Sequence, residues 1–246
     1  MHTYQIIVEY LGTNFVGWQI QRNGLSVQEV IEKVLSKFLK DKIKVIGSGR
    51  TDAGVHASEQ SAHFLTKHKI IEKNIFINSI NFFLGKYSIS ILDIKKKQTG
   101  FHARHSARER IYKYFIINRH SSLVLEKNKA WHIKKKLDVK IMRKGVDILK
   151  GTHNFSTFRA SSCQAKSPIK TMKNATIKKN KHSIILTFQS KSFLQQQVRS
   201  MVGSLKYLGE GKWNLKDFKK AFLSKKRKMC APPAPAHGLY LSKIKY

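Results

Sequence analysis

The chain has 246 residues, of which 48 are Lys or Arg and 14 are Asp or Glu, so its formal net charge is +34 at pH 7. Hydrophobic residues make up 41% of the sequence, which excludes a disordered chain and allows one large domain or two small ones. No apolar run is long enough to cross a membrane, and two cysteines, Cys163 and Cys230, exclude a disulfide framework and a CxxC metal site.

The N-terminal part of the chain shows strand and helix patterns that do not strictly alternate. Apolar side chains at every second position of 3–10 predict a half-buried strand. Ser26 and Glu29 have the spacing of a capping box, and the apolar positions that follow, Phe38 among them, share one face of a helix. The next expected elements are a strand ending at Ile46, a strand through Phe64, a helix over Glu72–Leu84 and a strand over Ser88–Ile94.

The polar, basic stretch Lys95–Gly100 is interpreted as a linker, after which the patterns resume. The expected elements are a strand over Arg108–Asn118, a helix over Leu137–Leu149, a hairpin of 168–178 with 183–190, a helix carrying the stripe Phe193–Leu205, a short helix after Asn214, a loop at Pro232–Pro235 and a strand from Gly238. We therefore expect an α+β protein with two similar halves, 1–97 and 98–246, facing each other across a cleft.

The net charge is the strongest bulk feature of the chain. A chain this basic is expected to bind a polyanion, most simply nucleic acid. Lys outnumbers Arg 38 to 10, as drift toward A- and T-rich codons would produce, so drift accounts for part of the charge. The N-terminal residues lead directly into a strand pattern without a signal peptide, which points to a cytoplasmic protein.

The most distinctive stretch is 46–57, which holds three glycines, one cation, Arg50, and one anion, Asp52. Glycines at this density indicate a sharp turn or a close approach of the backbone to another group. A carboxylate between two strand patterns is well placed for chemistry. The alternative is an ordinary turn in which Asp52 bonds its own backbone. A phosphate-binding loop is discounted, because the Gly-Lys-Ser/Thr ending is missing.

Three other features could complete a site. Arg110 and Tyr112 share one face of a predicted strand, where a cation beside a ring suits phosphate contact and base stacking, although this stretch by itself favours a half-exposed strand whose tyrosines belong to the core. Arg199 follows an apolar helix stripe and could reach a buried carboxylate or extend to water. Phe158 and Arg159 end a polar, aromatic loop consistent with RNA contact. The histidines show no zinc-ligand spacing, and no catalytic triad is indicated.

Taken together, these stretches are similar to the motifs of one known family. Gly49–Ala57 resembles the signature of the tRNA pseudouridine synthase A (TruA) family. The remaining resemblances follow in the family's order over almost the whole chain, at 17–19 with 26–29, at 101–114, at 154–164, at 193–203 and at 238–241. Any one of them could arise by chance, but the set is highly specific.

The resemblance implies a pseudouridine synthase fold, with two α+β halves built on mixed, mainly antiparallel sheets around a basic cleft. It implies a homodimer in which one tRNA touches both subunits, and no cofactor or metal. The implied reaction converts uridine to pseudouridine at positions 38, 39 and 40 of the tRNA anticodon stem-loop.

By the same resemblance, Asp52 falls on the catalytic aspartate, Tyr112 on the active-site tyrosine and Arg199 on the arginine that pairs with the aspartate. Arg50 falls on the arginine that helps to displace the target base, and Leu239 on an apolar pocket residue. The carboxylate could attack C1′ or C6, or remove a sugar proton, and the sequence leaves these branches open.

The chain departs from the family pattern at Leu11 and His102, where Asp is usual, within Gln195–Gln197, and at Ser200, where Asn is common. None of these is a catalytic position, so they bear on local packing and on the range of tRNAs accepted. Two rival functions remain open: a non-catalytic RNA-binding or chaperone protein of the same fold, and a pseudouridine synthase that acts on another RNA.

Overall fold

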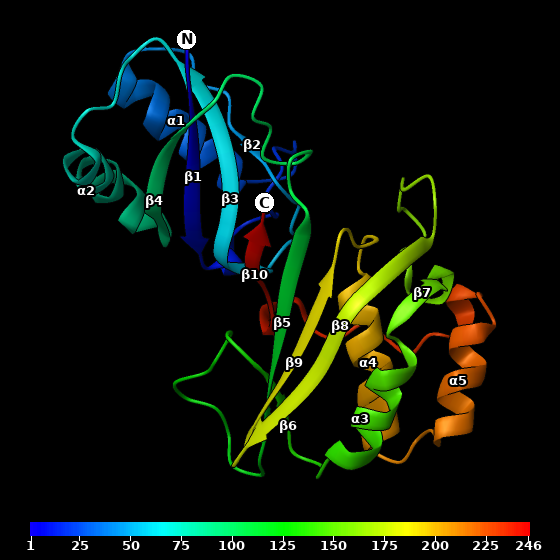
Figure 1. Ribbon diagram of the computed structural model, residues 1–246. Coiled ribbons are helices and arrows are strands. Elements are labelled where there is room, and N and C mark those ends of the chain that lie inside the picture. Colours follow the sequence, from blue (N-terminus) through cyan, green and yellow to red (C-terminus); the bar gives the residue numbers. More distant parts are fainter. The chain divides into compact units, whose positions relative to one another are not determined.

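The computed structural model describes residues 1–246 and divides the chain into two compact units. The first unit comprises Met1–Arg108 with Tyr240–Tyr246, and the second comprises Glu109–Leu239. Each unit combines helices with a mixed, mainly antiparallel sheet (Figure 1), so the expected α+β class is confirmed.

The sheet of the first unit has the strand order β4-β1-β3-β10, and β2 also pairs with β3. All these pairs are antiparallel except the parallel pair of β10 with β3. The elements of this unit are β1 (His2–Tyr10), α1 (Val27–Leu39), β2 (Ile46–Gly47), β3 (His56–Thr66), α2 (Lys73–Leu84), β4 (Ile89–Lys97) and, as its last strand, β10 (Leu239–Lys245), whose first residue is counted with the second unit.

The core of the first unit follows the alternation seen in the sequence. The even-numbered side chains of β1 from position 4 to 10 are all at most 3% exposed. Ser26 caps α1 by accepting a hydrogen bond from the backbone N–H of Glu29 at 3.2 Å, whereas the Glu29 carboxylate pairs with Lys33 at 2.7 Å. The Ser26 half of the predicted capping box is therefore confirmed. Phe38, on the apolar face expected for this helix, lies 40% exposed at its margin with its ring edge-on to Phe76 of α2.

The linker interpretation of the stretch after Ile94 is wrong for its three lysines. Lys95–Lys97 continue β4 and pair in register with Thr3–Gln5 of β1. The lysine side chains of a sheet can extend to solvent while their backbone completes the ladder, so a basic composition did not indicate a break in structure.

The second unit has the strand order β5-β9-β8-β7, with β6 paired in parallel to β5. Its elements are β5 (Glu109–Asn118), β6 (Trp131–Ile133), α3 (Val139–Ile148), β7 (Gly151–Asn154), β8 (Ile169–Asn180), β9 (Ser183–Ser190), α4 (Gln197–Gly209) and α5 (Leu215–Leu223). The predicted hairpin is confirmed as β8 and β9, and the predicted helices as α3, α4 and α5, except that Phe193 and Leu194 lie before the start of α4. The short strands β6 and β7 were not expected.

The second unit packs its helices on the sheet through apolar side chains. Ile184, Leu186 and Phe188 of β9 are fully buried. Helix α5 starts with a reciprocal capping box, in which Asn214 and Asp217 each accept a hydrogen bond from the other's backbone N–H. These contacts fix the frame on which β5 and α4 present their polar side chains.

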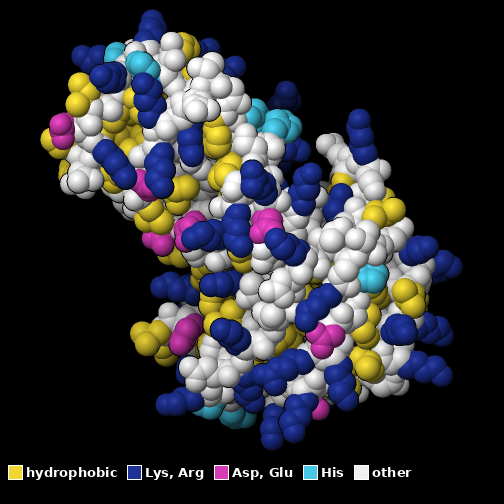
Figure 2. All heavy atoms as spheres, in the orientation of Figure 1, with side chains coloured by type: hydrophobic (Ala, Val, Ile, Leu, Met, Phe, Trp, Pro, Cys, Tyr) yellow, Lys and Arg dark blue, Asp and Glu magenta, His cyan; other side chains and the backbone are white.

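Lys and Arg side chains are spread over the visible surface of both units and far outnumber Asp and Glu there (Figure 2). None of the helices combines the length and the apolar composition that a membrane span needs.

A buried histidine in the first unit joins two segments of the chain. Nδ1 of His63 accepts a hydrogen bond from the backbone N–H of Ala103 at 3.2 Å, which only an unprotonated ring nitrogen can do. The ring also bonds the backbone of Ile46, at the start of β2. Burial, with a further contribution from the neighbouring His102, lowers the pKa of His63 below its usual 6.5.

We expect the first unit to lose stability as the pH falls from 6.5 through the pKa of folded His63, because the unfolded chain takes up this proton first. Replacing the ring in His63→Gln removes the titration, so the loss of urea midpoint between about pH 7.5 and pH 5.5 should shrink relative to the native chain. His68→Gln, at an exposed histidine of the same unit, is the control and should leave the loss unchanged. An equal loss in His63→Gln and the native chain would contradict the assignment.

Candidate active site

Asp52 lies on the loop of residues 48–55, between β2 and β3, and this loop is docked on the segment 12–18. The carbonyl oxygen of Thr51 accepts a hydrogen bond from the Trp18 N–H at 3.1 Å, and Asp52 forms an antiparallel bridge with Gly17. Asp52 itself is partly exposed. The loop is thus paired like a short strand, and the carboxylate is carried on a fixed backbone.

Two glycines allow the segment 12–18 to come this close. Gly17 has φ +117°, and a Cβ there would lie 2.5 Å from the carbonyl oxygen of Thr51. A Cβ on Gly12 would lie 2.0 Å from the carbonyl oxygen of Val55. Either side chain would push the Asp52 loop away, so both positions require glycine.

Buried polar contacts support the loop from below. The hydroxyl groups of Tyr10 and Thr51 lie 2.8 Å apart, and the Tyr10 ring packs on the indole of Trp18, which is 2% exposed. Nδ1 of His56 accepts a hydrogen bond from the Gly12 N–H at 2.8 Å. Sequence reasoning missed this support, although the glycines of the 12–18 segment were a visible signal. Arg50 is exposed at the start of the same loop.

In the second unit, Tyr112 lies on β5 and is 8% exposed. Its ring stands edge-on to Phe193, with 5.1 Å between the ring centroids and an interplanar angle of 84°. Arg110, two residues earlier on the strand, donates a hydrogen bond from Nη1 to the carbonyl oxygen of Lys191 at 2.6 Å. Strand β5 therefore holds a largely buried ring and a cation in one row.

Arg199 lies in the first turn of α4 and is partly buried. Its Nε donates a hydrogen bond to the carbonyl oxygen of Ala234 at 2.7 Å. Its charge also faces Tyr114, whose hydroxyl has a pKa raised strongly by burial, with the cation acting in the opposite direction. Leu239, at the start of β10, is 5% exposed.

Two residues expected to touch substrate make contacts within the second unit. Phe158 is 1% exposed and stacks on Phe222 of α5, with 5.4 Å between centroids and an interplanar angle of 20°. The ring belongs to the core of the second unit, and its burial leaves no face for a base. Arg159 is partly exposed and donates a hydrogen bond from Nη2 to the carbonyl oxygen of Cys163.

The sequence-predicted residues are divided between the units: Arg50 and Asp52 belong to the first, and Tyr112, Arg199 and Leu239 to the second. The structure contains no group of three or more His, Cys, Asp or Glu placed to hold a metal ion. A carboxylate, a guanidinium group and an aromatic hydroxyl are the groups that this set can offer a reaction.

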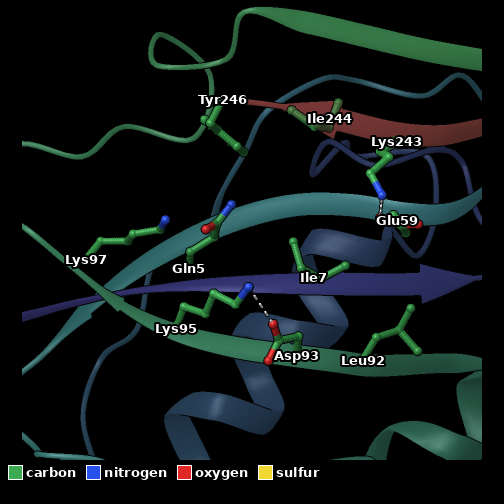
Figure 3. A pocket seen from close by; sticks show the side chains of 10 residues that line it. All are labelled: Gln5, Ile7, Glu59, Leu92, Asp93, Lys95, Lys97, Lys243, Ile244 and Tyr246. Atoms are coloured by element: carbon green, nitrogen blue, oxygen red, sulfur yellow. Dashed lines mark ion pairs between the residues drawn. The ribbon is translucent and has the colours of Figure 1, made fainter.

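A pocket of about 480 Å³ lies on the sheet of the first unit (Figure 3). The lysines drawn there are partly neutralised, because Lys95 pairs with Asp93 at 3.3 Å and Lys243 pairs with Glu59 at 3.4 Å. None of the sequence-predicted site residues lines this pocket, so we keep it apart from the candidate active site.

Comparison with known proteins finds a family model, full-length relatives and a solved structure. A family model described as tRNA pseudouridine synthase matches residues 6–105 and 146–246. The chain is 61% identical over 246 residues to the tRNA pseudouridine synthase A of Pelagibacter ubique (strain HTCC1062), covering 100% of both chains. It is 44% identical over 245 residues to the enzymes of that name from Ehrlichia ruminantium strains Gardel and Welgevonden, covering 99% of each chain. A crystal structure of a Cbf5-Nop10-Gar1 complex aligns with 82% of this chain and 44% of that chain, at 10% identity and a TM-score of 0.37.

We expect Gly17→Ala to lower the free energy of unfolding of the first unit by about 1–3 kcal/mol, because alanine at this positive φ is strained and its Cβ meets the Thr51 carbonyl. Hydrogen exchange should locate the damage at the Trp18 amide, which should exchange faster. Gly85→Ala is the matched control, since Gly85 has φ −55° and open space around its Cβ position. Unchanged exchange at Trp18 in Gly17→Ala would show that the loop does not depend on this approach.

Proposed function

Because the chain belongs to the tRNA pseudouridine synthase A family, we propose that it isomerises uridine to pseudouridine at positions 38, 39 and 40 of the tRNA anticodon stem-loop. The observation that carries the proposal is the placement of Asp52, a carboxylate held on a backbone that is bridged to Gly17. A chain with 14 acidic residues against 48 basic ones presents few other carboxylates in such a setting.

The reaction is an isomerisation, so its atoms balance without an oxidant or a second substrate. The bond between N1 and C1′ breaks, the uracil turns, and a bond forms between C5 and C1′. The proton of C5 is lost and N1 finally carries one. In this proposal Asp52 acts on the ribose or on the ring, by attack at C1′ or C6 or by removing a sugar proton. Each branch requires an ionised carboxylate.

The second unit supplies the other groups in this proposal. Arg199 pairs with Asp52 and favours its ionised form. Tyr112 packs on the uracil ring and accepts the C5 proton. Leu239 forms an apolar wall that keeps water from the detached base. We therefore propose that the two halves carry different parts of the site, the Asp loop in the N-terminal half and the tyrosine and arginine in the C-terminal half.

The charge of the chain supports an RNA substrate in this proposal. A paired uridine is unreachable inside a stem, so it must leave the base stack, and we assign Arg50 to the place it vacates. Arg110 and Arg159 are proposed to contact phosphates, and Phe158 is left out because its ring is buried. We further propose that the enzyme works in the cytoplasm as a homodimer, with one tRNA touching both subunits.

We expect Asp52→Asn to form no pseudouridine while its fold and its affinity for tRNA stay unchanged, because the substitution removes only the ionisable group. Product is measured by mapping pseudouridine in tRNA transcripts, and binding by filter retention. Asp147→Asn is the control, since Asp147 is an exposed residue of α3 that pairs with Lys150. Appreciable turnover by Asp52→Asn would exclude the assigned role.

We expect pseudouridine only at positions 38 to 40 when the protein is incubated with tRNA transcripts or with the isolated anticodon stem-loop. Transcripts with cytidine at these positions should stay unmodified, which tests whether uridines elsewhere in the tRNA are modified. Binding without product in the native protein would favour a non-catalytic RNA-binding or chaperone function. Product in an unrelated RNA fragment at a similar rate would favour a different substrate.

A further inference from the structure

A segment of the second unit, residues 227–235, crosses helix α4 beside Arg199, and we refer to it as the strap. The backbone N–H of Ala234 donates a hydrogen bond to the carbonyl oxygen of Arg199 at 3.0 Å. In return, Nε of Arg199 donates a hydrogen bond to the carbonyl oxygen of Ala234 at 2.7 Å. The same two residues are thus joined twice, once through the backbone of the arginine and once through its side chain.

The Nε bond has a directional consequence. A guanidinium group holds its five N–H donors in one rigid plane, so a bond at Nε also sets the direction of the donors at the tip. An arginine side chain has many rotamers, and a partner fixed on the backbone removes part of that freedom before substrate arrives. Ala234 is fully buried, so the accepting carbonyl does not move with solvent.

Gly203 is the position that lets the strap come so near. It lies one helical turn after Arg199 and faces the same side of α4. A Cβ built there would lie 2.0 Å from the carbonyl oxygen of Pro232 and 3.3 Å from the backbone nitrogen of Ala234. The contacts are with backbone rather than with a flexible side chain. Any side chain at 203 must therefore move the strap.

Both ends of the strap are anchored within the same unit. Near its start, Nη1 of Arg227 donates a hydrogen bond to Oγ of Ser200 at 2.8 Å. At its end, the hydroxyl of Tyr114 donates a hydrogen bond to the carbonyl oxygen of Pro235 at 2.8 Å. Tyr114 is a fully buried residue of β5, two positions after Tyr112. The strap thus ties Arg199 to the strand that carries the proposed active-site tyrosine.

The composition of the strap favours a rigid backbone. Three of its last four residues are prolines, at positions 232, 233 and 235. Each proline has a fixed φ, so the segment loses little further entropy on folding and has few alternative conformations. The carbonyl groups of this segment are therefore held at a defined distance from α4.

From this geometry we infer that the strap positions the guanidinium group of Arg199 for the isomerisation, and that Gly203 and Tyr114 are positioning residues that act through it. The inference rests on the proposed function, which gives Arg199 its role beside the reacting carboxylate. It adds a set of residues that touch no substrate and yet govern the turnover number. A misplacement of about 1 Å in a reacting group can cost about 100-fold in rate.

The test compares two variants and one control with the native protein, by steady-state kinetics and by hydrogen exchange of the Arg199 Nε proton. The signal of this proton is assigned by its loss in Arg199→Lys. Gly203→Ala should displace the strap, and Tyr114→Phe should release its end while keeping the ring. Each should lower kcat by about 10- to 100-fold, with little change in KM. Each should also speed Nε exchange by at least about tenfold, because the Ala234 acceptor is withdrawn.

The matched control is Gly209→Ala, on the same helix. A Cβ at 209 would meet the flexible side chain of Met142 at 2.6 Å instead of the strap, so it perturbs packing without moving Ala234. It should leave kcat and the Nε exchange rate at their native values. Circular dichroism and the thermal midpoint verify that each variant is folded. Should Gly203→Ala fail to fold, Tyr114→Phe, which only loses a hydroxyl group, decides the question.

Native kcat in variants whose Nε exchange is accelerated would overturn the inference, and so would a fall in kcat with unchanged exchange. The exchange measurement needs no substrate, so it separates this inference from the proposed function. If the native protein makes no pseudouridine, the proposed function and the catalytic part of this inference are both overturned, even if the strap holds Arg199. If the native protein is active, and Gly203→Ala and Tyr114→Phe keep native kcat and native Nε exchange as Gly209→Ala does, the strap inference alone is wrong.

Discussion

Backbone packed directly against backbone, at points where only glycine fits, is the constraint on which the proposed chemistry depends in both units. In the first unit, the loop of Asp52 lies against a segment whose Gly12 and Gly17 would each clash with it if they carried a Cβ. In the second unit, the strap lies on α4 at Gly203. Contacts of this kind hold a group more firmly than side-chain packing, because a backbone segment cannot change rotamer. Because the two backbones lie so close, even a single methyl group at these glycines would disrupt the contact.

Periodicity in the sequence predicted the elements that bury one face. Strand β1, helix α1 and the hairpin of β8 and β9 each carry a regular apolar pattern, and their existence and approximate bounds follow from it. Short strands such as β6 and β7 have too few residues to show a period, and their pairing is decided by neighbours far away in sequence. Lys95–Lys97 were misjudged for a related reason, since the backbone ladder of an edge strand is indifferent to the charge of its side chains.

In the candidate site, too, a local sequence motif indicates some residues, whereas their contacts with distant residues can be seen only in the structure. The motif around Asp52 drew attention to a carboxylate among glycines, and similarity to a family suggested roles for Tyr112 and Arg199. Neither could show that the Thr51 carbonyl meets the Trp18 amide, or that the guanidinium of Arg199 is held by Ala234. Phe158 shows the opposite error, in which the sequence suggested a site residue that the structure places elsewhere. It is an aromatic residue in a polar stretch of sequence, and its ring fills the core of the second unit. Partners that lie far along the chain leave no local trace in composition.

The last strand of the first unit has a consequence for how the protein is made. Tyr240 of β10 pairs with His56 of β3, and the hydroxyl of Tyr246 lies 2.7 Å from that of Ser61, a separation of 185 residues. The second unit is one uninterrupted stretch inserted between these partners. On the ribosome it can therefore complete its own sheet early, whereas the first unit must wait with an open edge at β3 until β10 emerges. The sheet that supports the Asp52 loop is therefore the last to be completed, although β1, β3 and β4 are made first.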